Sequence, residues 1–291
     1  FLGRTSVFPL AEIDRDLFDK ALGLKALGNE LCNAVGGRSV HPITAVPGGF
    51  THEISGDEYL QFAEKLEATR EFAMVTLDLF RDFEAAKVEM KGDLLAMVND
   101  KGYPVCTSRK ARFVKAGITF DCAEEEEHIE EYPVSHSSAL LARVRETQEP
   151  FMTGALARVN ASWNGLSKSA KIAAAKASLR PPEMNVMMNN VAQAVEIVDV
   201  LERCSLLCRR LAANDFEGDS TPVAIVPRAG RGVGFTEAPR GVLMHDVTFD
   251  EQGRVEKASI MTPTALNVAS MEETMRTLAE QMIEKGAEEP E

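Results

Sequence analysis

Two short segments in the last third of the chain combine residue types that suit binding of a small, strongly hydrogen-bond-accepting ligand. They are residues 237–241 (EAPRG) and 262–267 (TPTALN). In each segment a proline fixes the backbone, while Arg240 offers a planar fork of donors and Thr264 offers a hydroxyl. Together they would form a rigid cradle of donors. The plainer interpretation is an arginine that only satisfies carbonyl groups in a tight turn.

The residues between these two segments explain how the segments could meet. Apolar and polar residues alternate over 242–249 and again over 255–260, on either side of a glycine-containing turn at 250–253. This period of two predicts a β-hairpin. Because the two open ends of a hairpin lie together, the hairpin would bring residues 237–241 and 262–267 side by side.

Most of the remaining chain has the apolar spacing of amphipathic helices. Helices are predicted over residues 14–35, 55–89, 162–179, 184–211 and 271–285, and shorter strands and turns over 93–131. Ser55 and Glu58 have the spacing of a capping box, and Gly36-Gly37 suits a left-handed C-cap. The sequence therefore predicts a mainly α fold with a small β-element, the hairpin near the C-terminal third.

The cysteines and histidines form no complete metal-binding motif. The five cysteines are Cys32, Cys106, Cys122, Cys204 and Cys208, and no Cys-x-x-Cys occurs. Cys204 and Cys208 share a helical face and could be half of a metal site, but their apolar neighbours favour simple burial. Of five scattered histidines, His41 in a glycine-rich loop is the least expected to be incidental. A sparse, odd set of cysteines indicates a reducing cytoplasm.

Two further patterns have functional and structural interpretations. The glycines of residues 230–234 (GRGVG) follow the apolar run 223–226 and superficially resemble a phosphate-binding loop, but a strand rather than a helix is predicted to follow. The acidic run 124–127, with Glu130 and Glu131, is predicted to be a solvated face, with an ion site as the alternative.

Length and charge exclude several classes of function. The chain has 291 residues and a net charge of −13, from 32 basic and 45 acidic residues. An acidic chain is poorly suited to nonspecific binding of nucleic acid or of an anionic membrane surface. The sequence also contains no apolar run long enough to span a membrane.

Several motifs together resemble those of a known enzyme family. They are, in chain order, residues 36–49 (GGRSVHPITAVPGG), 126–128 (EEH), 133–140 (PVSHSSAL), 154–160 (GALARVN), 237–241 (EAPRG) and 262–264 (TPT). The ordered set is similar to that of the large subunits of nickel–iron hydrogenases, and it covers nearly the whole chain. The similarity is greatest to the cytoplasmic branch of the family that works with F420 or NAD(P).

The resemblance implies an oxidoreductase that interconverts H₂ with protons and electrons. In this family a Ni–Fe centre carrying CO and cyanide is held by four cysteine thiolates, from one Cys-x-x-Cys pair near each end of the large chain. By motif position, Arg240 resembles the guanidinium beside the metals and Thr264 the donor to a cyanide. Pro239 and Pro263 resemble residues that shape the pocket. The implied partners are F420- or NAD(P)-linked electron-transfer subunits and an iron–sulfur small subunit.

The sequence also departs from the family pattern. The cysteine pairs are absent, Gln193 stands where the family usually has arginine, and Leu266 replaces a commoner glutamine. The chain opens on Phe1 with sequence typical of the middle of a domain. We therefore expect residues 1–291 to form one hydrogenase-like region, a fragment of a longer subunit that binds no Ni–Fe centre and is inactive alone.

Two alternatives to the fragment remain from the sequence. The first is a metal-free homologue that serves as a structural or interaction subunit of a redox complex. The second is a helical protein that binds phosphate or nucleotides through Arg231 and Arg240.

Overall fold

The computed structural model describes residues 10–81, 87–99, 102–103, 108–214, 221–284 and 286. Contacts divide the chain into two compact units, Phe1–Thr76 with Val198–Val226, and Leu77–Ile197 with Pro227–Glu291. The prediction of one region over residues 1–291 stays a prediction. Parts of the sequence expectations fall outside the described residues, namely residues 82–86 of the predicted long helix and Cys106.

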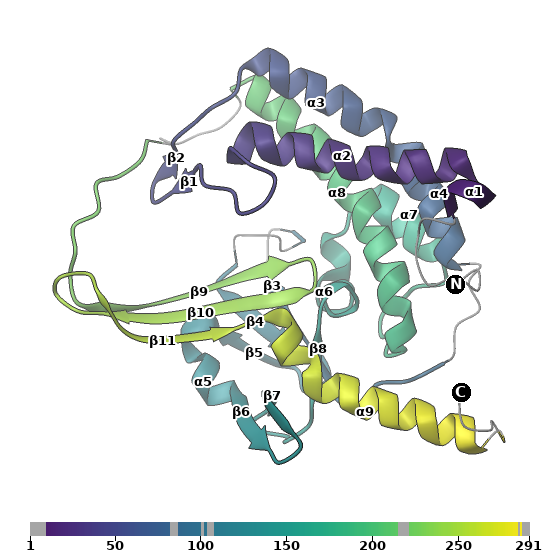
Figure 1. The fold of residues 1–291 in the computed structure, drawn as a ribbon, viewed down its shortest axis with the longest axis vertical. Helices are drawn as coiled ribbons and strands as arrows, with labels where there is room; N and C mark the ends of the chain where they lie inside the picture. The colour runs from purple at the N-terminus through teal and green to yellow at the C-terminus, as the bar shows by residue number, and fades with distance from the viewer. Residues whose placement is uncertain are drawn as a thin grey trace. The chain divides into compact units, whose positions relative to one another are not determined.

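The first unit is built from helices. It contains α1 (Leu10–Ile13), α2 (Arg15–Gly36), α3 (Gly56–Ala68), most of α4 (Arg70–Arg81) and the later turns of α8 (Asn189–Ala212), with the two-residue strands β1 (Ala45–Val46) and β2 (Gly49–Phe50) (Figure 1). The C-cap predicted for α2 is confirmed, and the structure adds an N-cap at Asp14. Asp14 accepts a hydrogen bond from the Leu17 amide, and Gly37 is left-handed with φ of 77°.

The single long helix predicted from residue 55 to 89 is wrong. Its capping box at Ser55 and Glu58 is present, but the helix breaks at Thr69 and gives way to α4. The Thr69 hydroxyl donates to the Lys65 carbonyl, 2.6 Å away, which satisfies an acceptor at the end of α3. Farther on, Glu89 forms an isolated β-bridge with Asn185 instead of continuing a helix.

A pH-dependent ion pair joins α3 to α8 within the first unit. The Glu67 carboxylate accepts hydrogen bonds from Arg209 Nε and Nη2 at 3.0 and 2.8 Å and from the Ser205 hydroxyl at 2.7 Å. The Arg209 hydrogen bond, followed by that from Ser205, lowers the pKa of Glu67 to about 2. A carboxylate with a lowered folded-state pKa stabilises the fold above its unfolded pKa, and this stabilisation is lost as pH falls.

We therefore expect Glu67→Gln to lower the melting temperature at pH 6 to 7 and to have progressively less effect between about pH 4.5 and 2. Thermal unfolding followed by circular dichroism across this pH range measures the difference. Glu64→Gln is the matched control, since Glu64 lies on the same helix but its carboxylate makes no hydrogen bond to Arg209. An effect of Glu67→Gln that is independent of pH would contradict the assignment.

The second unit contains three sheets. One has the order β5-β4-β3-β8 and another the order β11-β10-β9, while β6 and β7 form a hairpin. The strands are β3 (Asp93–Val98), β4 (Lys110–Phe113), β5 (Ile118–Asp121), β6 (Ile129–Val134), β7 (Ser137–Val144), β8 (Phe151–Thr153), β9 (Gly230–Ala238), β10 (Gly241–Phe249) and β11 (Val255–Met261). All pairs are antiparallel except β3 with β8.

Helices and short 3-10 turns connect these strands. They are η1 (Cys122–Glu124), α5 (Glu125–His128), α6 (Ala155–Ser162), η2 (Trp163–Gly165), α7 (Lys168–Lys176), η3 (Val186–Met188), the first turns of α8, and α9 (Pro263–Glu284). The helix predicted over 162–179 is shorter than expected, because Ser167 caps α7 by accepting from the Ala170 amide. The helix predicted to start near 271 begins eight residues earlier, at Pro263.

The mainly α fold class predicted from the sequence is therefore corrected to a mixed α/β fold. The predicted hairpin is confirmed as β10 and β11, in which Met244 pairs with Met261. The glycines of residues 230–234 are not a loop, because they form the start of β9 and pair along β10 from Phe249 inward. The apolar run 223–226 before them is neither strand nor helix, and its side chains are exposed.

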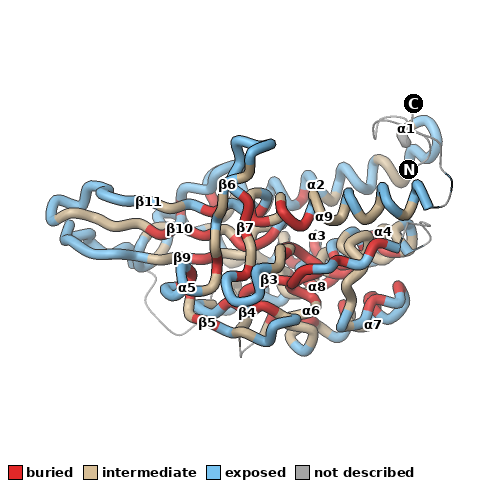
Figure 2. Tube along the Cα trace, turned by 90° about the horizontal axis from the view of Figure 1, so that it is seen from below, coloured by how far each residue is buried: buried red, intermediate tan, exposed pale blue. Residues whose placement is uncertain are grey.

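The core of the second unit is shared by its sheets and by α9. Phe113 lies at its centre, with ring centroids 5.7 Å from Phe120 and 5.2 Å from Phe151. Leu266, one of the departures from the family pattern, is fully buried in the same cluster, so its methyl groups fill core space. Figure 2 shows buried residues along β3, β7 and β10, whereas the far ends of β9 and β11 are exposed.

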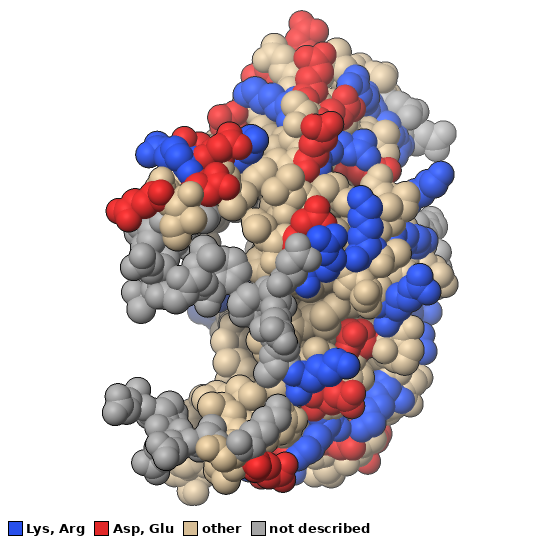
Figure 3. Space-filling view, turned by 90° about the vertical axis from the view of Figure 1, so that its right-hand side faces the viewer, with Lys and Arg blue, Asp and Glu red and all other residues tan. Residues whose placement is uncertain are grey.

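Figure 3 shows basic and acidic side chains interspersed on the face in view. Within the described part of the chain, no helix is both long and apolar enough to cross a membrane.

Candidate active-site turns

The residues of the EAPRG motif form the end of one strand, a tight turn and the start of the next. Glu237 and Ala238 end β9, Gly241 begins β10, and the pair Ala238 with Gly241 closes a two-residue turn made of Pro239 and Arg240. Both turn residues are at least partly exposed. The structure therefore presents Arg240 in a tight turn between two paired strands, where the sequence predicted a loop.

The second segment differs from the predicted loop. Residues 263–267 form the first turns of α9, with Pro263 buried at its first position and Thr264 exposed. Proline suits this position because its missing amide donor would be unsatisfied there and its φ is already helical. The Thr262 carbonyl accepts the Leu266 amide at 3.1 Å. Thr264 is therefore presented by a helix start rather than by an irregular loop.

Thr153 and Gly154 join the two segments. The Val242 amide donates to the Thr153 hydroxyl at 2.9 Å, and the Thr153 amide donates to the Asn267 side-chain oxygen at 2.7 Å. A Cβ placed on Gly154 would lie 3.2 Å from the Arg240 carbonyl oxygen. The expectation that the hairpin brings the two segments together is confirmed, with β8 as the element between them.

A buried arginine holds the Pro239–Arg240 turn from behind. Arg158, on α6, donates to both Glu196 oxygens at 2.6 and 2.8 Å and to Glu237 at 2.9 Å. It also donates to the carbonyl oxygens of Ala238 at 2.9 Å and Pro239 at 3.1 Å. One guanidinium thus fixes the backbone of the turn and two carboxylates at once.

Two further donors complete this network. The Tyr103 hydroxyl donates to Glu196 at 2.6 Å, and the Met97 amide donates to Glu237 at 2.8 Å. Burial raises the pKa of Glu237, although Arg158 opposes the shift. Burial opposes ionisation of Arg158 as well, but its hydrogen bonds to Glu196 and the nearby carboxylates outweigh this and raise its pKa, so the guanidinium stays charged.

The roles of Arg158 and Glu196 were missed from the sequence. Arg158 belongs to the motif at 154–160, but nothing in that motif indicated a contact with the turn at 239–240. The available signal was a lone arginine in the apolar stretch Ala155–Val159, all of which is buried. A charged residue at such a position requires charged partners. The sequence did not reveal which residues these would be.

The described cysteines do not fit the ligand set that the resemblance implies. Cys32, Cys204 and Cys208 lie in the first unit and Cys122 in the second. Burial raises the pKa of Cys204 and Cys208, and raises that of Cys122 to about 12. None of these four cysteines lies in a Cys-x-x-Cys pair, so they do not match the implied ligand pattern. The predicted burial is confirmed for Cys208, whereas Cys204 is only partly buried.

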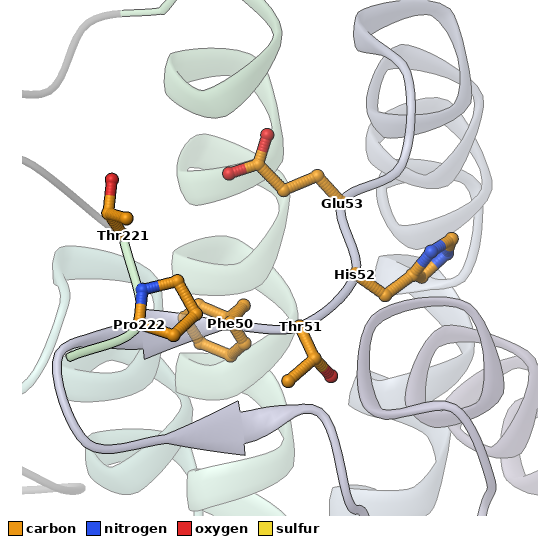
Figure 4. A pocket seen from close by; sticks show the side chains of 6 residues that line it. All are labelled: Phe50, Thr51, His52, Glu53, Thr221 and Pro222. Carbon is orange, nitrogen blue, oxygen red and sulfur yellow. The ribbon is translucent and has the colours of Figure 1, made fainter. Parts of the chain in front are cut away.

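His41, which the sequence singled out, and His52 both lie in the first unit, whereas the two turns belong to the second. His41 has φ of 53°, and its carbonyl, not its ring, accepts a hydrogen bond from Arg38 at 2.8 Å. His52 lines an open hollow of about 300 Å³ in the first unit, with Phe50, Thr51, Glu53, Thr221 and Pro222 (Figure 4). The His52 and Glu53 side chains diverge in Figure 4, so they do not converge on a common ligand.

The predicted solvated acidic face needs a correction. Glu124, Glu126 and Glu127 are at least partly exposed, but Glu125 is buried and pairs with Arg231 at 3.0 Å. The nucleotide-binding alternative is not favoured, because Arg231 lies on a strand and its guanidinium is engaged by Asp246 and Glu125. Gln193, the other departure from the family pattern, lies exposed on α8.

Comparisons with known proteins decide the family. No family model matches the chain. The vhu-type F420-non-reducing hydrogenase of Methanocaldococcus jannaschii has a subunit that is 27% identical over 282 residues, which cover 91% of this chain and 66% of that protein. The alpha subunit of sulfhydrogenase 1 of Pyrococcus furiosus is 33% identical over 274 residues, covering 89% and 60%.

A solved structure agrees with these relatives. The NAD⁺-reducing [NiFe]-hydrogenase in the H₂-reduced state matches 94% of this chain and 64% of its own, with a TM-score of 0.75 at 20% identity. The chain is a homologue of nickel–iron hydrogenase large subunits. The resemblance carried by the motifs is thus confirmed. The chain spans about two thirds of the length of these hydrogenase relatives.

Proposed function

We propose that this chain is part of a nickel–iron hydrogenase large subunit that, in its complete form, catalyses the reversible oxidation of H₂ to protons and electrons. The observation that carries this proposal is the joint anchoring of the Pro239–Arg240 turn and the start of α9 on Thr153, with Arg158 behind the turn. Such anchoring is needed where a guanidinium and a hydroxyl must keep fixed positions toward a small ligand.

Within the complete large subunit each motif residue would have a distinct role. Arg240 would be an electrostatic group beside the metals and Thr264 a hydrogen-bond donor to a cyanide. Pro239 and Pro263 would shape the pocket. The Ni–Fe centre itself would supply the cleavage of H₂. Electrons would pass first to an iron–sulfur small subunit, then to F420- or NAD(P)-linked subunits, and the assembly would work in the cytoplasm.

The chain by itself should bind no Ni–Fe centre, because soft thiolate ligands are required and the sequence has no Cys-x-x-Cys pair. We expect elemental analysis of the purified 291-residue chain to find nickel far below one atom per chain, and H₂-dependent dye reduction at background. A complete hydrogenase purified in parallel is the positive control. Stoichiometric nickel in the purified chain would overturn this expectation.

The second candidate is a metal-free homologue with a structural or interaction role in a redox complex, and the absence of Cys-x-x-Cys from the 291 residues favours it. The encoding reading frame distinguishes the two candidates. Cys-x-x-Cys codons in frame on both sides of this sequence would support the hydrogenase large subunit. Stop codons before any such pair would support the metal-free homologue.

A further inference from the structure

The stretch from residue 150 to residue 182 contains no acidic residue, although acidic residues outnumber basic ones by 45 to 32 in the whole chain. Its five basic residues are Arg158, Lys168, Lys171, Lys176 and Arg180. Arg158 is buried in the network behind the turn, and the other four lie on α7 or just after it. The sequence therefore concentrates positive charge on one short helix of an acidic protein.

Helix α7 has one buried side and one exposed side. The alanines at 170, 173 and 174 are buried. Lys168, Ile172 and Lys176 follow one another at intervals of four residues and so share a face of the helix. All three are exposed, with Ile172 at 49%, and the exposed Ala175 and the partly exposed Lys171 lie beside them. These five residues are called the α7 basic face below.

The lysines of the α7 basic face have no carboxylate partner among the described residues. The Lys171 ammonium donates to the Asn164 carbonyl at 2.9 Å, and the side chains of Lys168 and Lys176 form no ion pair or hydrogen bond within the described part of the chain. Other exposed lysines pair with a carboxylate at 2.6 to 2.8 Å, namely Lys20, Lys65 and Lys115. The fold therefore leaves the charge of the α7 basic face unneutralised.

This arrangement does not stabilise the helix itself. Lys168 is the first residue of α7, directly after the N-cap Ser167. The helix dipole favours acidic side chains at that position and disfavours basic ones. Lys168 and Lys171 are three residues apart, so their like charges repel each other. A role in binding explains these lysines better than a role in folding.

We propose that the α7 basic face binds an acidic surface of another protein. The nine residues of α7 span about 14 Å. Nucleic acid and an anionic membrane carry charge far beyond that length, which would meet the rest of a chain with a net charge of −13. A folded acidic protein can match a face of this size, with an apolar group packed on Ile172 between the lysines.

The inference does not depend on the proposed hydrogenase function, and its test uses the 291-residue chain with a defined acidic polypeptide. Fluorescein-labelled poly-L-glutamate is titrated with the chain, and fluorescence anisotropy follows binding. We expect saturable binding that weakens as NaCl increases. Replacing both Lys168 and Lys176 by glutamine should weaken it at least about tenfold.

The matched control removes the same charge from another exposed helix. Lys20 and Lys25 are exposed on α2, and replacing both by glutamine should change the affinity by less than about twofold. Loss of folding does not confound the comparison, because glutamine and lysine have similar helix propensities. The variant without Lys168 and Lys176 should melt at the same temperature as the unmodified chain or slightly higher, since Lys168 opposes the helix dipole.

A second probe tests the apolar part of the α7 basic face. A copolymer of glutamate and tyrosine should bind more tightly than poly-L-glutamate, because tyrosine rings can pack on Ile172. Ile172→Gln should abolish this difference and leave the affinity for poly-L-glutamate unchanged. Equal affinities of the unmodified chain for the two polymers would contradict the role of Ile172.

Three other results would overturn the proposal. They are the absence of saturable binding to poly-L-glutamate, equal losses in the α7 and α2 variants, and tighter binding of duplex DNA or of phosphatidylserine vesicles at the same ionic strength. Sedimentation velocity tests a second copy as the occupant. A salt-dependent dimer that is lost on replacing Lys168 and Lys176 would assign the face to self-association and also overturn the proposal.

Discussion

Replacing Arg158 by methionine should lower the free energy of unfolding of the second unit by about 3–5 kcal/mol. The Arg158 side chain is only 6% exposed, and it is the shared counterion of Glu196 and Glu237. Without it, the buried Glu237 carboxylate and the partly buried Glu196 carboxylate lose their shared counterion, and the carbonyl groups of Ala238 and Pro239 lose their donor. Urea unfolding followed by fluorescence and circular dichroism measures the loss.

An exposed ion pair provides the control for Arg158. Arg254 pairs with Asp250 in the β10–β11 turn and is 76% exposed, so Arg254→Met should cost less than about 1 kcal/mol. If the two substitutions had equal effects, the buried network would not be the reason for the stability of the turn. Adding Glu196→Gln and Glu237→Gln to Arg158→Met should restore part of the loss, since it removes the uncompensated charges.

Amide hydrogen exchange can distinguish a local effect on the turn from a general loss of stability. The Val242 amide donates to Thr153 directly beyond the turn. In Arg158→Met we expect hydrogen exchange at Val242 to accelerate more than exchange in β5, which among the described strands pairs only with β4. Uniform acceleration across both strands would indicate global destabilisation only.

The parts of the fold that the sequence predicted are those governed by local rules. The β10–β11 hairpin follows from alternating residues around a glycine turn, and the boundaries of α2 follow from Asp14 and Gly37. The place of Pro239 and Arg240 beside this hairpin follows from the same pattern. These features depend on residues that are close in sequence, so one amino-acid sequence is enough to predict them.

The parts that were missed depend on partners distant in sequence. Strand β9 is rich in glycine, and only its pairing with β10 makes it a strand. The sequence predicts Glu125 to be solvated like the acidic residues beside it. In the structure it is buried against Arg231, which lies 106 residues later in the chain. From the sequence, Arg158 was recognised only as part of a motif. Its partners Glu196 and Glu237 are distant in sequence and meet it only in the folded chain.

The separation of the turn network from the cysteines has a structural consequence. The Pro239–Arg240 turn is held by Arg158, Thr153 and the start of α9, and none of these contacts involves a thiol. The backbone of the turn is therefore held by hydrogen bonds from within the described chain.

Replacing Gly241 by alanine should destabilise the second unit by about 3 kcal/mol or more. Gly241 has φ of 132°, where an L-residue is strained, and a Cβ there would lie 2.4 Å from Thr153 Cγ2 and 2.6 Å from its hydroxyl. Thr153 is itself buried and hydrogen-bonded to Val242, so it has no room to withdraw. The substitution therefore adds overpacking to backbone strain.

Two glycine controls separate these contributions. Gly117 has φ of 71° but open space around it, so Gly117→Ala measures strain alone and should cost about 1 kcal/mol. Gly234, in β9, has open space and no positive φ, so Gly234→Ala should change the stability by less than about 0.5 kcal/mol. Combining Gly241→Ala with Thr153→Ser removes the Cγ2 contact and should recover part of the loss. If Gly241→Ala behaved like Gly117→Ala in urea unfolding, Thr153 would not be the residue that holds the turn.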